Sequence, residues 1–408
     1  MGFWNRYPHR FTITFGAIAL LLFVAEHING RFWLNDFRVY YGAGDALFTG
    51  EPLYGVAHGL GTGVFKYAPV LAMVYAVFAL LPYGLAASLQ YALITLAFLD
   101  GIRRIDRLVR EELLGGRKAS YLPLFLIGIT CVVHLHRELH LGNINMMLLW
   151  LLVVALEALL AGKHSWGGVL LGAAVLAKPH FLVLIPLLVL RGRSRTTGAA
   201  LLTVALGLLL PTTIFGWGGN LSTHAAWFAA MAEHNTALIY VTGDDYRAVN
   251  TIYSFLHRVL LRPVIGIPHN LEAYVLLGVI ASLFGLLVLM DRVREKTMGT
   301  RNAFAFEYLL LIALVPSITL TDTEHFLFVA PLVAFIMHGL LPRSHTSWLP
   351  YAAVPLLIAY GGNWEDALGP LSQHMVHYGL LGIGSFGMLV LSVIMYQRSN
   401  LSATHTSK

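Results

Sequence analysis

Cysteine and charged residues are what this sequence has least of. Its 408 residues include one cysteine, Cys131, which excludes an internal disulfide framework. Charged residues make up 12% of the chain, about half of their usual share in soluble domains. The sequence also lacks low-complexity segments, internal repeats and any stretch that we would assign to a soluble domain. A soluble, disulfide-stabilised or repeat architecture is therefore excluded.

Long hydrophobic runs are what the chain has instead. Hydrophobic residues make up 57% of it and the mean hydropathy is +0.69. Runs of roughly 20 apolar residues recur from end to end, and each can span a bilayer as a helix. Strands are excluded for such runs because lipid cannot satisfy open backbone groups. We predict an all-α, polytopic membrane protein with one integral membrane domain over residues 1–408.

Basic residues predict which loops face the cytoplasm. Lys and Arg outnumber acids by 27 to 21, an excess that we attribute to loops facing anionic lipid and not to nucleic-acid binding. They gather in 103–118, 191–195 and 292–301 and at Arg343. The positive-inside rule places all of these in the cytoplasm.

Two long polar interruptions then fall on the outer side, at 31–66 and 218–270. No small-residue cleavage site follows the first apolar run, so we interpret it as the first helix and not as a signal peptide. Thirteen apolar segments would leave the termini on opposite sides. We therefore expect either 65–82 or 84–102 to cross incompletely, which gives about twelve crossings with both termini inside. The sequence leaves open which of the two does so.

Residues 166–190 form two apolar arms around a polar tip, Lys178-Pro179-His180. Pro179 removes a backbone donor and disfavours helix in the residue before it. We predict a broken hairpin whose tip is Lys178. An ionisable group at that depth is costly and usually functional, which favours a phosphate-binding role. The alternative is a lysine that extends to the outer interface.

The segment 31–66 holds acids, bases, many aromatic residues and many glycines. Connections of this length are usually functional or disordered, and the aromatic content with low charge argues against disorder. We expect an ordered loop on the membrane surface, with Asp36 as its catalytic candidate. The alternative is an ordinary acid paired with Arg31 or Arg38, and the residues alone do not separate the two.

Five short stretches then follow in order along the chain. They are Asp36 with Tyr40 and 65–69, 141–145, 168–179, 250–253 with Arg258, and Glu324-His325 with Pro331. In this order and spacing they resemble glycosyltransferase family 87, which includes mannosyltransferases that use polyprenyl-phosphate mannose. The chain departs from the family pattern at Asn143, where glutamine is usual, and at Glu324, where an aromatic or small residue is usual. These departures leave the sugar open.

The resemblance implies a GT-C membrane fold with a long first outer loop. It also implies an inverting transfer of a hexose, namely mannose, from a polyprenyl-phosphate donor to a lipid or glycan acceptor. The reaction would take place on the periplasmic or outer side of a bacterial inner membrane, beside membrane lipids. We expect neither a metal nor another cofactor, and no nucleic-acid partner.

The site residues follow from the resemblance together with local chemistry. Asp36 would take the proton of the acceptor hydroxyl, as a general base does, and His325 would assist it. The donor phosphate would lie against Lys66, Lys178 and Arg258. Substrate contacts are expected from seven polar residues: Tyr40, Tyr67, Asn143, Asn145, His180, Asn250 and Glu324.

Other roles stay open for some of these residues. His325 follows Thr321, Asp322 and Thr323, which are good helix caps, so a capping role is compatible with a catalytic one. His136 and His140 have a workable metal-ligand spacing, but the string HRELH is not the HExxH of zinc proteases, and we favour interfacial histidines. Aromatic residues in 218–270 suit sugar stacking, although an interfacial aromatic belt is the commoner cause.

Two other classes of function compete with a transferase. A transporter or flippase for a lipid-linked saccharide predicts inverted repeats, and we detect none. An inactive scaffold in an envelope complex predicts no catalytic carboxylate, which makes Asp36 the residue that separates it from an enzyme.

Overall fold

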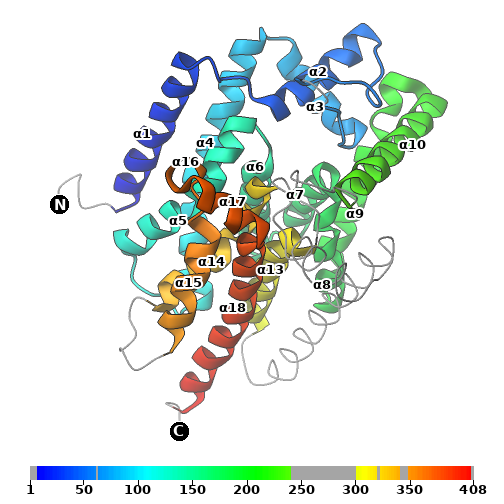
Figure 1. The fold of residues 1–408 in the computed structure, drawn as a ribbon. Coiled ribbons are helices and arrows are strands. Elements are labelled where there is room, and N and C mark those ends of the chain that lie inside the picture. The colour runs from blue at the N-terminus through cyan, green and yellow to red at the C-terminus, as the bar shows by residue number, and fades with distance from the viewer. Residues whose placement is uncertain (1–6, 61–62, 240–299, 319–321, 341–347, 406–408) are drawn as a thin grey trace, which may run out of the picture. The chain divides into compact units, whose positions relative to one another are not determined.

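The computed structural model describes residues 7–60, 63–239, 300–318, 322–340 and 348–405 (Figure 1). Within these residues every regular element is a helix, and one isolated antiparallel bridge joins Ala57 and Val64. The prediction of an all-α protein is confirmed. Residues 240–270 of the predicted outer loop, Arg343 and all but the last two residues of the basic cluster 292–301 lie outside the described residues.

The chain divides into two compact units. The amino-terminal unit consists of Thr12–Gly101 and Leu135–Ala237. The carboxyl-terminal unit consists of Met1–Phe11, Ile102–His134 and Leu238–Lys408. Each unit is therefore assembled from segments that are far apart in the sequence.

Five helices in the described residues are long and apolar enough to cross a membrane, and a pair bent by 90° makes a sixth if it counts as one span. Their bounds are Pro8–Ile28, Tyr83–Leu113, Tyr121–Leu141, Thr323–Leu340 and Leu380–Arg398, with the bent pair Ser194–Leu209 and Thr212–Glu233. Helix α3, Pro69–Ala79, has 11 residues and is about 16 Å long, roughly half of the hydrocarbon thickness. Of the two segments expected to cross incompletely, 65–82 and 84–102, the first is therefore the one too short to cross alone. The total of about twelve crossings stays a prediction.

The amino-terminal unit places the start of one helix, α6, beside the end of the next, α7. Its helical elements, some of which continue into the other unit, are α1 (Tyr7–Ile28), α2 (Asn35–Thr49), α3, α4 (Tyr83–Leu108), α5 (Tyr121–Leu141), α6 (Asn145–Leu160), α7 (His164–Ala177), the 3-10 turn η3 (Pro179–Val183), α8 (Leu184–Leu190), α9 (Ser194–Leu209) and α10 (Thr212–Ile239). Gly167 near the start of α7 faces Leu159 near the end of α6, so these helices are antiparallel. The start of α6 and the end of α7 consequently lie at the same end.

Glycines set the packing of α7 against α9. A Cβ on Gly168 would lie 2.4 Å from the carbonyl oxygen of Thr196, and one on Gly172 would lie 2.6 Å from that of Ala200. Gly207, further along α9, faces Leu176. The two helices therefore run parallel, so the chain between them must return along η3 and α8. The predicted break is confirmed, because α7 ends at Ala177 and Lys178 is extended.

Two predicted loops contain helices. Residues 35–49 of the expected surface loop form α2, whose buried face includes Phe37, Tyr40 and Gly44 at helical spacing. This face packs on α3, where a Cβ on Gly44 would meet the backbone of Tyr75 at 2.6 Å. The numerous glycines suggested irregular structure, but here glycine permits close packing. Likewise, residues 218–239 belong to α10 and not to a loop.

The carboxyl-terminal unit packs its helices around an apolar and partly charged core. Its elements are the π-helical turn η2 (Val109–Leu113), α13 (Thr300–Ile318), the 3-10 helix η6 (Thr323–Val329), α14 (Ala330–Leu340), α15 (Leu349–Gly361), α16 (Glu365–Leu368), α17 (Pro370–His377) and α18 (Leu380–His405), together with the parts of α4 and α5 in its range. Phe306 and Tyr396 stack with ring centres 4.0 Å apart. Asp106 is 1% exposed and lies between Arg110 and His338, with contacts of 3.0 and 2.7 Å.

Candidate active site

Asp36 lies in the first turn of α2. A carboxylate there interacts favourably with the helix N-terminus. Leu34 precedes the helix with φ 43° and ψ 65°, a left-handed conformation that is costly for leucine. Leu34 is nevertheless buried, and the hydroxyl of Tyr83 donates to the carbonyl of Trp33 beside it. The entry to α2 is thus held in one conformation, which fixes the direction in which Asp36 leaves the backbone.

Asn143 holds the carboxylate of Asp36. Its Nδ2 donates to Asp36 Oδ2 over 2.6 Å. Its Oδ1 accepts from the backbone N–H of Ile144 at 2.7 Å and from the hydroxyl of Tyr40 at 3.1 Å. Because two donors face Oδ1, the amide can present only its NH2 group to Asp36. Asp36 is therefore held as a hydrogen-bond acceptor, which is the form that a general base needs.

A pair of tyrosines lies behind this contact. The hydroxyls of Tyr40 and Tyr67 are 2.9 Å apart, and their rings meet edge to face. Burial raises the pKa of both phenols well above its usual value, and the nearby charge of Asp36 raises each further. Both hydroxyls consequently stay protonated at any working pH. Tyr40 can therefore serve as a permanent donor to Asn143, with Tyr67 donating to Tyr40.

The turn before α6 brings Asn143 to this position. Gly142 has φ +68°, and a Cβ there would lie 2.8 Å from Phe37 Cβ and 3.0 Å from Leu34 Cβ. Gln90 on α4 donates to the carbonyl of Gly142 at 3.1 Å. Glycine is thus required both by the backbone conformation and by the approach of α2.

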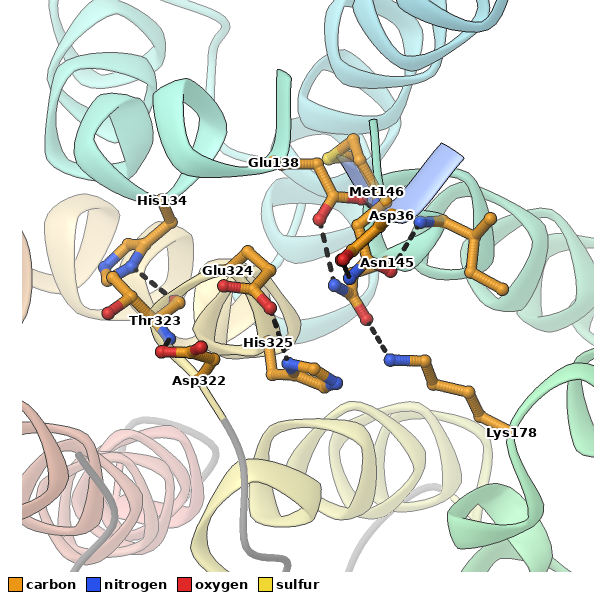
Figure 2. A network of polar contacts seen from close by, with 12 residues as sticks. Asp36, His134, Glu138, Asn145, Met146, Lys178, Asp322, Thr323, Glu324 and His325 are labelled. Atoms are coloured by element: carbon orange, nitrogen blue, oxygen red, sulfur yellow. Dashed lines mark hydrogen bonds and ion pairs between the residues drawn. The ribbon is translucent and has the colours of Figure 1, made fainter. Parts of the chain in front are cut away.

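Lys178 takes part in a second set of contacts in the same unit. It is 5% exposed, and its Nζ donates to Asn145 Oδ1 over 2.6 Å (Figure 2). Asn145 Nδ2 in turn donates to Glu138 Oε2 at 2.9 Å. The ammonium therefore does not extend to the interface. It also lies over the ring of Tyr67, 6.0 Å from its centre, which connects these contacts to those of Asp36.

Two other predicted residues, Lys66 and His180, lie in the same unit. Lys66 is half-buried, and its backbone carbonyl accepts from the indole of Trp227 on α10 at 3.0 Å. His180 lies in η3, two residues after Lys178. Arg38 places its guanidinium over the ring of Tyr83, 4.4 Å from the ring centre. Arg258 and Asn250 lie outside the described residues.

His325 and Glu324 belong to the carboxyl-terminal unit. Glu324 is buried, and its Oε1 lies 3.3 Å from His325 Nδ1. The expected cap is present: Asp322 accepts from the backbone N–H of Thr323, although the helix that follows is 3-10 and not α. His134 presents both ring nitrogens to backbone carbonyls, those of Thr323 and Tyr360, at 2.9 and 3.1 Å.

Glu138 is the residue of this network that the sequence interpretation missed. In the sequence it stands in HRELH, one position after the place of the glutamate in HExxH. It is 0% exposed and contacts both Asn145 and the backbone of Met146. The available signal was its place in an apolar helix, where a buried acid is costly and commonly functional. As for metals, the described residues contain no group of three or more His, Cys, Asp or Glu side chains placed to hold one.

Comparison with known families decides the class of the protein. The profile of glycosyltransferase family 87 matches residues 65–321, which is more than half of the chain. This protein belongs to glycosyltransferase family 87. The match includes Tyr67, Asn143, Asn145 and Lys178, whereas Asp36 precedes it and His325 follows it.

Two solved structures are similar to this chain. ArnT from Cupriavidus metallidurans bound to undecaprenyl phosphate aligns with a TM-score of 0.38 and 14% identity, over 95% of this chain and 77% of that chain. Its apo form aligns with a TM-score of 0.33 and 15% identity, over 95% and 76%. A search of the curated proteins found no match.

Proposed function

We propose that this glycosyltransferase moves a hexose, namely mannose, from a polyprenyl-phosphate donor to a hydroxyl of a lipid or glycan acceptor. The transfer inverts the anomeric centre and takes place in a GT-C fold at the outer side of a bacterial inner membrane. Family membership supports glycosyl transfer. The contacts of Asp36 and Lys178 support a one-step transfer from a phosphate-linked donor.

The observation that carries the proposal is that a base and a cation belong to one connected set of contacts. Asp36 is joined through Asn143 and Tyr40 to Tyr67, and the ring of Tyr67 lies beneath the ammonium of Lys178. A one-step transfer needs both groups at once. The base accepts the proton of the acceptor while the cation stabilises the phosphate that leaves.

The chemistry balances without another reagent. The bond between the sugar's anomeric carbon and the phosphate oxygen breaks, and a bond from that carbon to the acceptor oxygen forms. The acceptor proton passes to Asp36, and the phosphate departs on its lipid with the bonding electron pair. Lys178, with Lys66 and Arg258, would hold the phosphate through charge-assisted hydrogen bonds. Tyr40, Tyr67, Asn143, Asn145, His180, Asn250 and Glu324 would orient the two substrates, and His325 would assist proton transfer.

The deciding experiment gives the purified protein a panel of lipid-linked sugars and identifies products by mass. Polyprenyl-phosphate mannose, polyprenyl-phosphate glucose and nucleotide-linked mannose form the minimal panel, each tested with and without a chelator. We expect product from the first donor, without loss on chelation. Product from the nucleotide-linked sugar alone would reject the lipid-phosphate donor.

The side of the membrane is tested separately by cysteine labelling in a Cys131→Ser background. Asp45 is exposed on α2 and Lys118 is exposed after η2. Asp45→Cys should react with a membrane-impermeant reagent added from outside, and Lys118→Cys should react only after the membrane is opened. The reverse pattern would place the Asp36 contacts on the cytoplasmic side.

A further inference from the structure

Glu138 is a buried acid that the proposed reaction does not use directly. It lies near the end of α5 and is 0% exposed. A carboxylate removed from water is strongly unfavourable unless hydrogen bonds and an opposite charge compensate it. Glu138 must therefore have partners that compensate its burial.

Its two oxygens bind two different groups at the start of α6. Oε1 accepts from the backbone N–H of Met146 at 2.8 Å, and Oε2 accepts from Asn145 Nδ2 at 2.9 Å (Figure 2). The N-cap of α6, Ile144, makes no side-chain capping bond. Glu138 therefore caps this helix from α5, where a negative charge also suits the helix N-terminus.

The same contact determines which way the amide of Asn145 faces. A carboxylate can only accept, so the NH2 group of Asn145 must face Glu138. An ammonium can only donate, so the oxygen of Asn145 must face Lys178, and these atoms are 2.6 Å apart. The two buried charges are thus linked by an amide that has only one satisfactory orientation.

We propose that Glu138 is a positioning residue for the donor phosphate and acts on Lys178 through Asn145. It orients the Asn145 amide, and the amide oxygen fixes the ammonium where the phosphate will bind. The inference rests on the proposed function, because it assigns a role in the lipid-phosphate site. It predicts that the hydrogen-bond polarity of residues 138 and 145 matters more than either side chain by itself.

Glu138→Gln tests this polarity, since glutamine has one acceptor oxygen for two donors. Either Met146 loses its cap or the Asn145 amide turns and presents its NH2 group to Lys178. Asn145→Asp alone sets a second carboxylate against Glu138. The double variant Glu138→Gln/Asn145→Asp exchanges carboxylate and amide. It conserves the charge and keeps the three hydrogen bonds described above, because the new amide at position 138 donates to the new carboxylate at position 145, which also accepts from Lys178.

The measurement is the affinity of each folded variant for undecaprenyl phosphate in detergent, together with the KM for the lipid-linked donor. Both single variants should bind about tenfold more weakly, as expected when a buried polar partner is lost. The double variant should return to within about threefold of the wild type, the non-additivity that contacting residues show. Glu157→Gln, the same change at a half-buried position on α6, is the control and should leave both values unchanged.

Affinity and KM do not depend on how much protein is active, so a purely structural role would lower the yield and leave both values unchanged. Wild-type affinity in Glu138→Gln, or a double variant as weak as the single ones, would overturn the inference while the proposed function stands. Failure of the wild type to bind undecaprenyl phosphate would instead reject the proposed function. If Glu138→Gln gives no folded protein, Asn145→Ala takes its place. It removes the link but keeps the cap, and unchanged affinity there overturns the inference equally.

Discussion

Two clusters of buried charge in this glycosyltransferase are built differently. In the carboxyl-terminal unit, Asp106 directly contacts Arg110 at 3.0 Å and His338 at 2.7 Å. In the amino-terminal unit, the amide of Asn145 lies between Lys178 and Glu138. Both clusters are shielded from solvent, because Asp106 is 1% exposed and Lys178 is 5% exposed.

The difference indicates what each cluster does. An acid in direct contact with two bases is compensated by them and joins α4, η2 and α14. Arg110 also donates to the backbone carbonyl of Arg117, and Arg117 donates to the backbone carbonyl of His338. Lys178 instead lies at the break after α7 and over the ring of Tyr67, which joins it to the contacts of Asp36. We therefore interpret the first cluster as structural and the second as a prepared anion site. The following predictions test that distinction.

The largest effect is expected at Asp36. Asp36→Asn keeps the shape of the side chain but cannot accept a proton, so kcat should fall by about two to four orders of magnitude. Donor affinity and protein yield should stay close to those of the wild type. Asp45→Asn is the matched control, because Asp45 is exposed on the same helix. Turnover near the wild-type value in Asp36→Asn would remove Asp36 as the base.

Asp106→Asn should affect stability and not chemistry. Removing one charge of a buried ion cluster costs about 3–5 kcal/mol, so the unfolding midpoint in detergent should fall clearly. The folded fraction should keep its kcat and its donor KM. Glu111→Gln, at an exposed position in η2, should change stability by less than about 0.5 kcal/mol. A raised donor KM in folded Asp106→Asn would contradict the structural interpretation.

Lys178→Ala should weaken donor binding, and Lys178→Arg should retain part of it because the positive charge survives. Loss of a charged hydrogen bond is worth about 1.5–3 kcal/mol, so KM for the donor should rise by roughly tenfold to a hundredfold. The KM for the acceptor should not change. If Lys178→Ala bound the donor as tightly as the wild type, Lys178 would have only a structural role.

The smallest effect is expected from adding one methyl group at Gly142. Gly142→Ala would press on Leu34 and Phe37, which flank Asp36, and should lower kcat by about tenfold through misplacement of the base. Gly162→Ala is an unusually close control. Its φ of +76° resembles the +68° of Gly142, but a Cβ there meets nothing within 4 Å. Backbone strain is thus common to both variants. Equal kcat in the two would show that the approach of α2 to Gly142 does not position Asp36.

The features that could be predicted from the sequence were those determined by short stretches of consecutive residues. Long apolar runs indicated the helices, and Lys178-Pro179 indicated the break where α7 ends. The family order indicated Asp36, Tyr40, Tyr67 and Asn143, which the structure brings into contact. Their roles in catalysis stay predictions. The contacts themselves were not predictable, because Tyr40 and Asn143 are 103 residues apart and meet only through packing of α2 against the turn before α6.

Other features depended on packing and were therefore missed. Helix α2 was interpreted as a loop, because its glycines look like turn residues unless the face of α3 against which they pack is known. Glu138 was passed over, because its partners are contributed by the start of α6. The incomplete crossing at 65–82 followed only from the 11-residue length of α3. For α2 and Glu138 the missing information was the neighbouring helix, and for segment 65–82 it was the position at which α3 ends.

The burial of Lys178 has a consequence for turnover. Before transfer, the phosphate of the proposed donor is a diester with one negative charge. Afterwards it is a monoester, whose charge at pH 7 is about −1.5 to −2. A cation that is 5% exposed is poorly screened by solvent, so it attracts the spent lipid carrier more strongly than the fresh donor. We expect competitive product inhibition by the lipid phosphate, which should bind more tightly than the donor.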